Sequence, residues 1–104
     1  MDKNEPILQE IKKAVLGVEP NAEVMLFGSR ARGDFHEESD WDVLVLTDED
    51  EKDFEFKRKI RRSLLDVQLR VGEGISTIIH NKNWWNKLKA TPLYSEINKD
   101  GLGL

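Results

Sequence analysis

Two short stretches decide the fold of this chain: FGSRARG at residues 27–33 and SDWDV at residues 39–43. Each adjoins an apolar run that is rich in strand-forming residues, EVMLF at 23–27 and WDVLVLT at 41–47. The first run predicts a strand that ends in a glycine–serine bend. The second predicts a strand that opens with two aspartates. The polar residues between them predict a loop, whose first residues can open a short helix.

The glycine–serine bend has the chemistry of a phosphate site. Gly28 has no Cβ, so a phosphate can approach its backbone closely. Ser29 offers a hydroxyl group and a backbone N–H at the predicted strand-to-helix turn, where N–H groups and the helix dipole favour anions. Arg30 and Arg32 follow, and guanidinium groups bind phosphate oxygens bidentately. By itself, however, a Gly-Ser turn is common and an arginine pair most often faces water.

The two aspartates add a candidate metal-binding pair to the glycine–serine bend. Asp40 and Asp42 flank Trp41, and on an extended chain this spacing places both carboxylates on one face, roughly 6–7 Å apart. Trp41 then points to the opposite face, into the core. Two hard oxygen ligands so placed suit Mg²⁺, which proteins usually share with substrate phosphates. An isolated Asp-x-Asp usually faces water, so the prediction rests on the joint pattern, with ten residues between Ser29 and Asp40.

Helical periodicity surrounds these strands. Pro6 fits the first turn of a helix that runs to about residue 17 and carries apolar residues at four-residue steps. A longer helix is predicted over 53–71, a third strand over 75–80, and short helical segments after it. The order α, β, β, α, β, α predicts an α/β (α+β) fold, a small mixed β-sheet with helices packed on one face.

Leu65 and Leu69 fall outside the core stripe of the longer helix. Packing under the C-terminal segment is the favoured interpretation, and a partner surface is the alternative.

Composition narrows the class of protein. The 104 residues fit one domain, 1–104, and a net charge of -4 gives no support for broad nucleic-acid binding. The absence of Cys excludes disulfides, thiolate metal sites and a cysteine nucleophile. The polar N-terminus is unlike a signal peptide, and no apolar run approaches membrane-spanning length. We therefore expect a cytoplasmic protein with no membrane partner.

The order Gly28-Ser29, ten residues, Asp40-x-Asp42 resembles the signature of the DNA polymerase β-type nucleotidyltransferase superfamily, and specifically its minimal nucleotidyltransferase branch. The resemblance covers residues 22–47 firmly and extends more loosely over the tail 91–101. It implies a polymerase β-like nucleotidyltransferase fold. It also implies that Asp40 and Asp42 are catalytic residues and Mg²⁺ ligands. The nucleotide-binding residues that it implies are Gly28, Ser29, Arg30, Arg32 and Ser39.

The resemblance further implies a reaction and a partner. A nucleotidyl group, with adenylyl from ATP expected ahead of other NTPs, would pass to an acceptor hydroxyl as pyrophosphate leaves. The chain has no spare length for an acceptor-binding domain, so we expect another chain to complete that site. In the family the partner is commonly a HEPN-domain protein, and such pairs resemble toxin–antitoxin systems. The sequence leaves self-association into a homo-oligomer open.

One departure from the superfamily favours a second interpretation. A third carboxylate is usual on a neighbouring strand, yet the strand predicted at 75–80 has no Asp or Glu. Asp66 is the nearest acid, but its spacing from Arg62 and Arg70 favours a surface ion-pair ladder on a helix. His80 ends the third strand, where a structural role is favoured over that of a general base. The alternative function is a non-catalytic nucleotide-binding or antitoxin module that neutralises its partner by binding.

Overall fold

The computed structural model describes residues 5–104. All three predicted strands form, and the helix predicted from residue 53 begins at residue 54. A short strand at the C-terminal end, β4, was not predicted. No helix within the described residues has the length and apolar character needed to cross a bilayer. In chain order the helices and strands are α1 (Pro6–Val18), β1 (Glu23–Phe27), α2 (Gly28–Arg32), β2 (Trp41–Thr47), α3 (Phe54–Val71), β3 (Ile75–Asn81), α4 (Lys82–Asn86), α5 (Pro92–Asp100) and β4 (Leu102–Gly103).

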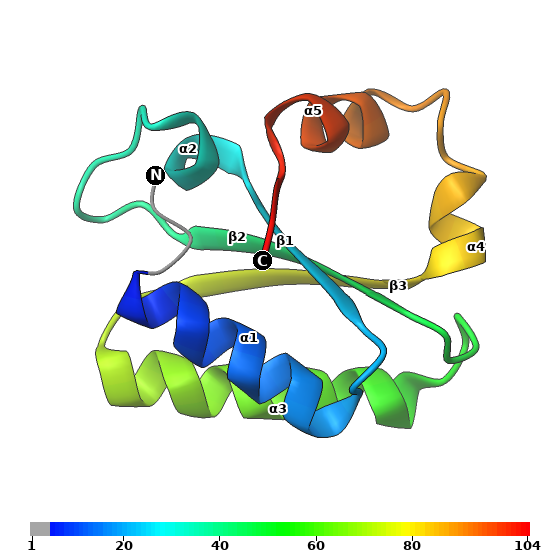
Figure 1. The fold of residues 1–104 in the computed structure, drawn as a ribbon, viewed down its shortest axis with the longest axis horizontal. Helices are drawn as coiled ribbons and strands as arrows, with labels where there is room; N and C mark the ends of the chain where they lie inside the picture. Colours follow the sequence, from blue (N-terminus) through cyan, green and yellow to red (C-terminus); the bar gives the residue numbers. More distant parts are fainter. Residues whose placement is uncertain (1–4) are drawn as a thin grey trace.

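The strands form one mixed sheet in the order β3-β2-β1-β4 (Figure 1). β1 runs antiparallel to both β2 and β4, whereas β2 runs parallel to β3. β4 is a short strand held by its pairing with β1. Leu102 lies opposite Leu26, and the Leu104 N–H donates to the Val24 carbonyl at 2.8 Å. β3 is an edge strand, paired on one side only among the described residues.

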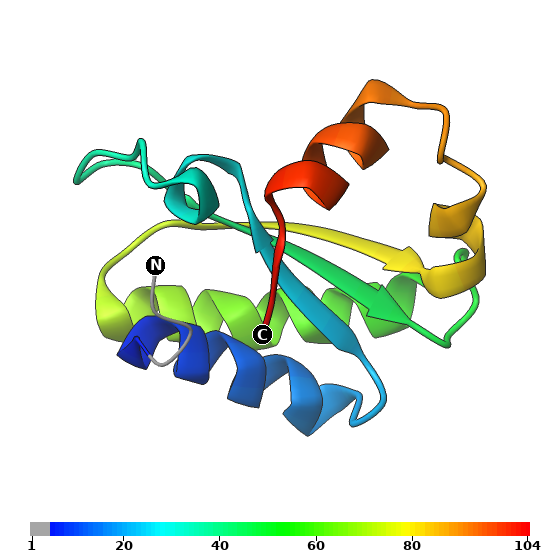
Figure 2. The ribbon, with the colours of Figure 1, turned by 45° about the horizontal axis from the view of Figure 1, so that its top comes forward.

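Helices cover the sheet unequally. The two long helices, α1 and α3, lie side by side against one face, as predicted (Figures 1 and 2). β2 alternates between the two faces: Trp41, Val43 and Val45 enter the core under α1 and α3. Leu44 and Leu46 enter a second, smaller core with residues of α4 and α5. The short helices therefore add a partial layer on the opposite face, and burial on both sides explains the continuous apolar sequence of β2.

The outer side of α3 corrects one expectation. Leu65 and Leu69 were expected to pack under the C-terminal segment, but they are 48% and 73% exposed. The C-terminal helix α5 packs on the opposite face of the sheet from α3 (Figure 2), so it cannot cover these leucines.

Candidate functional site

The glycine–serine bend and the aspartate pair meet at the junction of β1 and β2. The antiparallel register places Phe27 opposite Asp42, so Gly28 follows directly beside the Asp42 side chain. Gly28 has φ +74°, and a Cβ built on it would lie 2.3 Å from Asp42 Oδ2. A larger residue at position 28 would therefore be strained in its backbone and would collide with the carboxylate.

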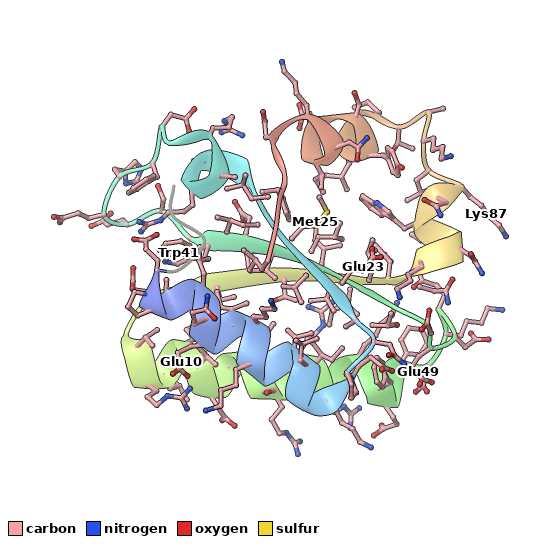
Figure 3. All side chains as sticks on the ribbon, viewed as in Figure 1. Glu10, Glu23, Met25, Trp41, Glu49 and Lys87 are labelled. Atoms are coloured by element: carbon pink, nitrogen blue, oxygen red, sulfur yellow. The ribbon has the colours of Figure 1, made fainter. Side chains whose placement is uncertain are left out.

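Asp40 rests against another glycine. A Cβ on Gly74 would lie 2.3 Å from Asp40 Oδ1, and the Gly74 carbonyl accepts a hydrogen bond from the Trp41 N–H at 2.9 Å. Trp41, labelled in Figure 3, lies between the aspartates in sequence and is 2% exposed in the core formed with α1 and α3. Its indole N–H donates to Glu73 Oε1 at 3.1 Å. The prediction that Trp41 points into the core is confirmed.

The electrostatics of the aspartates fit a divalent cation. Partial burial raises the pKa of the Asp42 carboxyl, the neighbouring Asp40 charge raises it further, and Arg32 lowers it. A cation between the two carboxylates would offset both unfavourable effects. Within residues 5–104 no cluster of three or more His, Cys, Asp or Glu side chains is arranged to hold a metal ion. Asp40 and Asp42 are two hard oxygen donors that could hold Mg²⁺ if phosphate oxygens and water completed its coordination shell.

Asp42 is paired with Phe27 on the β1 side and with Ser76 on the β3 side. Asp42 and Ser76 are paired in the parallel register, which places their side chains on the same face of the sheet. No carboxylate therefore stands beside Asp42 on the β3 side. Asp66 is exposed and lines a groove between α1 and α3 instead. The predicted ion-pair ladder through Asp66 is wrong, because Asp66 forms no ion pair with a residue that the structure describes and Arg70 pairs with Glu10 at 2.6 Å.

Arg30 occupies a different environment from the one expected of a phosphate ligand. Its side chain is only 8% exposed, and its guanidinium lies 4.3 Å from the Phe35 ring centre and 4.5 Å from that of Trp41. It donates hydrogen bonds to the carbonyls of Ser39 and Glu37 at 3.0 and 3.4 Å. These donors hold the loop that carries the aspartates in position, and a contact between Arg30 and the nucleotide stays a prediction.

Ser39 takes part in the same loop structure. Its hydroxyl oxygen accepts a hydrogen bond from the His36 N–H at 3.0 Å, and its carbonyl accepts from Arg30. The side chain is therefore engaged within the loop, and direct contact between Ser39 and the nucleotide stays a prediction.

Arg32 is more exposed than Arg30 and is paired with carboxylates. Its side chain is 44% exposed and forms ion pairs with Asp34 at 3.1 Å and with Asp100 at 3.6 Å. The hydrogen bond to Asp34 raises the pKa of Arg32, and Asp100 adds to this effect. Asp100 ends α5, so this contact connects the C-terminal helix to the glycine–serine bend. Sequence reasoning missed both Asp100 and Gly74, because neither lies in a local pattern that distinguishes it.

His80 lies at the far end of β3 from Ser76. Its Nδ1 is 2.8 Å from Glu51 Oε2, and its ring stacks on Trp84 with the centroids 4.3 Å apart. These contacts agree with the structural role that was favoured.

Comparisons with known proteins bear on this site. Residues 7–97 match a family model described as a nucleotidyltransferase domain. Two proteins of Methanocaldococcus jannaschii, provisionally named protein adenylyltransferases, are 39% identical over 64 residues and 40% identical over 78 residues. The matches cover 62% and 73% of this chain but 58% and 78% of the relatives, so the first alignment spans little more than half of that protein.

The fold also has a counterpart among solved structures. A crystal structure from Sulfolobus solfataricus, described as that of a provisional nucleotidyltransferase, superposes with a TM-score of 0.64. The superposition covers 93% of this chain and 75% of the Sulfolobus chain. At 24% sequence identity it supports the fold alone.

Proposed function

Because this chain belongs to the nucleotidyltransferase domain family, we propose that it transfers an adenylyl group from Mg²⁺–ATP to a hydroxyl group on a partner protein. The observation that carries the proposal is the contact between Gly28 and the Asp42 carboxylate. It joins a phosphate-binding bend to a metal-binding pair, as a single magnesium–triphosphate complex requires. The relatives named as protein adenylyltransferases support a protein acceptor and an adenylyl donor.

In this proposal each residue of the site has a defined task. Asp40 and Asp42 would hold Mg²⁺, which would offset negative charge on the triphosphate and on the leaving pyrophosphate. Gly28 lets the phosphates approach the backbone, and Ser29 offers its N–H and hydroxyl at the start of α2. Arg32 contributes an exposed guanidinium that Asp34 and Asp100 keep in place. Arg30 acts indirectly, by holding the loop before Asp40.

The reaction forms a bond between the acceptor oxygen and the α-phosphorus and breaks the bond from that phosphorus to the oxygen that bridges to the β-phosphate. Pyrophosphate carries away the electron pair of the broken bond, and the acceptor proton passes to solvent. No carboxylate on β3 is available to take that proton, because Ser76 occupies the position beside Asp42. Catalysis therefore depends on positioning and electrostatics, and a slow chemical step is expected.

The acceptor site extends beyond this chain. The proposal places residues 1–104 in the cytoplasm as one catalytic domain, whose acceptor is supplied by a HEPN-domain protein. In such a pair, adenylylation of the HEPN protein would silence it, and this chain would act as the antitoxin.

A second function is favoured by one observation. Ser76 in place of a carboxylate weakens acceptor activation, which suits a module that binds a nucleotide and neutralises its partner by contact. In that case the nucleotide would stabilise the complex without being consumed.

One experiment separates the two functions. The chain is incubated with Mg²⁺, labelled ATP and a co-expressed HEPN partner, and the partner is examined by mass spectrometry for added AMP. Transfer that is absent in Asp42→Asn but retained in Asp48→Asn supports the enzyme. Asp48 is a suitable control because it follows β2 at its other end, and its side chain is 60% exposed. Stable binding with no added mass supports the module.

A further inference from the structure

Three large apolar side chains of α3 are exposed to solvent. Leu65 and Leu69 lie one turn apart and are 48% and 73% exposed, and Phe54 at the start of the helix is 70% exposed. Residues spaced by four lie on the same face of a helix, so the two leucines form one ridge. Among the described residues, α3 carries three of the six large apolar side chains that face solvent.

The same helix is positively charged in an acidic protein. Residues 54–71 contain six Lys or Arg and two Asp or Glu, a net charge of +4, although the whole chain has a net charge of -4. Arg61 and Arg62 lie about one turn before Leu65 and form no ion pair with any residue that the structure describes. Complementary charge on a partner would therefore be negative.

The ridge adjoins the edge strand of the sheet. Leu65, Gln68 and Ile75 line a groove of about 170 Å³ between α3 and β3. The edge of β3 is partly closed to a further strand, because Gln68 accepts a hydrogen bond from the Ile75 N–H and Arg61 donates to the Thr77 carbonyl, both at 2.9 Å. These bonds favour side-chain docking into the groove over the addition of a fifth strand.

This surface adjoins the β3 side of the site, away from the glycine–serine bend. Gly28 and Ser29 approach Asp42 from the β1 side, whereas the β3 side presents the exposed Ser76. Asp42 lies between Trp41 and Val43, which face α3, so its side chain points to the opposite face of the sheet. A protein held on α3 therefore has to reach around the edge strand β3 to bring a hydroxyl group to Asp42. The sheet order places β1 and β3 on opposite sides of β2 (Figure 1), so the glycine–serine bend and Ser76 flank Asp42 from two sides.

We propose that Arg61, Arg62, Leu65 and Leu69 form a docking surface for the acceptor protein, which presents an aliphatic side chain surrounded by carboxylates. The inference rests on the proposed function, since it identifies where the acceptor binds. A second copy of this chain fits less well, because a two-fold contact through α3 would oppose two helices of net charge +4. RNA fits less well because it would use Arg61 and Arg62 but leave the exposed leucines without an apolar partner and place phosphates near the exposed Asp66.

The first arm of the test measures docking without chemistry. A benzophenone amino acid replaces Leu69 in the full chain that carries Asp42→Asn, and a matched chain carries it at Leu93 on α5, which is 43% exposed. Irradiation in cells that contain the acceptor should link position 69, and not position 93, to a peptide that is net negative and contains an aliphatic residue. Links to RNA, to a second copy of this chain, or in equal yield from position 93 would overturn the proposal.

The second arm measures transfer. Leu65→Asp with Leu69→Asp should raise the KM for the protein acceptor about tenfold or more, since the new carboxylates would oppose those of the acceptor, and like charges across an interface cost several kcal/mol. The Kd for Mg²⁺–ATP should stay unchanged, and Leu93→Asp should have no effect on either quantity. An unchanged KM would refute the docking surface. If no protein gains AMP while position 69 still links to an acidic peptide, the docking surface stands and the transfer reaction is wrong.

Discussion

Gly28→Ala offers the sharpest test of the site, because it adds one methyl group where the structure has no room for it. The new Cβ would lie 2.3 Å from Asp42 Oδ2, 3.1 Å from Asp42 Cγ and 3.3 Å from Asp42 Cβ. Rotation of the carboxylate relieves the first contact but leaves the Asp42 Cβ close. The backbone strain at φ +74° costs about 1–2 kcal/mol for a residue with a side chain. We expect Mg²⁺–ATP binding to be lost as the Asp42 carboxylate is displaced.

Gly72→Ala is a matched control for the backbone strain. Gly72 has φ +76°, and a Cβ there would meet nothing within 4 Å. The backbone strain should lower the Tm of both variants, by about 4–8 °C for each kcal/mol in a domain of this size, as measured by thermal unfolding. Only Gly28→Ala should lose nucleotide binding, as measured by calorimetry with Mg²⁺ and ATP.

A double-mutant cycle then isolates the contact itself. Combining Gly28→Ala with Asp42→Ala should be less destabilising than the sum of the single changes, because removing the carboxylate removes the collision. We expect a coupling free energy of about 0.5–1 kcal/mol, at the lower end for residues in contact. The reasoning is refuted if Gly28→Ala binds Mg²⁺–ATP like the wild type, or if the two substitutions are additive.

Three further perturbations test separate parts of the structure. Arg30→Ala should destabilise the fold by about 2–4 kcal/mol, since it removes buried hydrogen bonds to the loop; urea unfolding measures this, and normal stability with weakened ATP binding would show that Arg30 is a phosphate ligand. Ser76→Asp should restore a carboxylate beside Asp42 and raise AMP transfer at least about tenfold. It should also increase the stabilisation by Mg²⁺, and Ser95→Asp on α5 should do neither. Partial burial would raise the pKa of Glu51, but hydrogen bonds from Lys57, the Asn81 N–H and His80 lower it below its ordinary value of 4.5. Its contribution to stability is therefore complete above that value and is lost as the pH falls through the lower folded pKa. Glu51→Gln should unfold more easily at neutral pH and lose less stability on acidification below about pH 4.5; parallel curves for the two proteins would contradict this.

Local sequence was enough to predict where most of the helices and strands lie, while the ligands of the motif stay predictions. Strand and helix positions follow from local apolar periodicity, so α1, β1, β2, α3 and β3 were all predicted within a residue or two. The alternation of side chains along a strand is equally local. It fixed the burial of Trp41 between two aspartates on the other face.

The contacts between residues distant in sequence became known only from the tertiary structure. Whether Asp40 meets Gly74, or Arg32 meets Asp100, depends on strand register and on how α5 folds back, and no local spacing encodes either. Arg30 and Arg32 lie two residues apart in one motif, yet one is buried under the loop and the other stays exposed. Likewise, the exposure of Leu65 and Leu69 follows from α5 packing on the far face of the sheet. The physical reason is that local sequence sets backbone conformation and side-chain direction, whereas the neighbours of a side chain are set only when separate elements pack together.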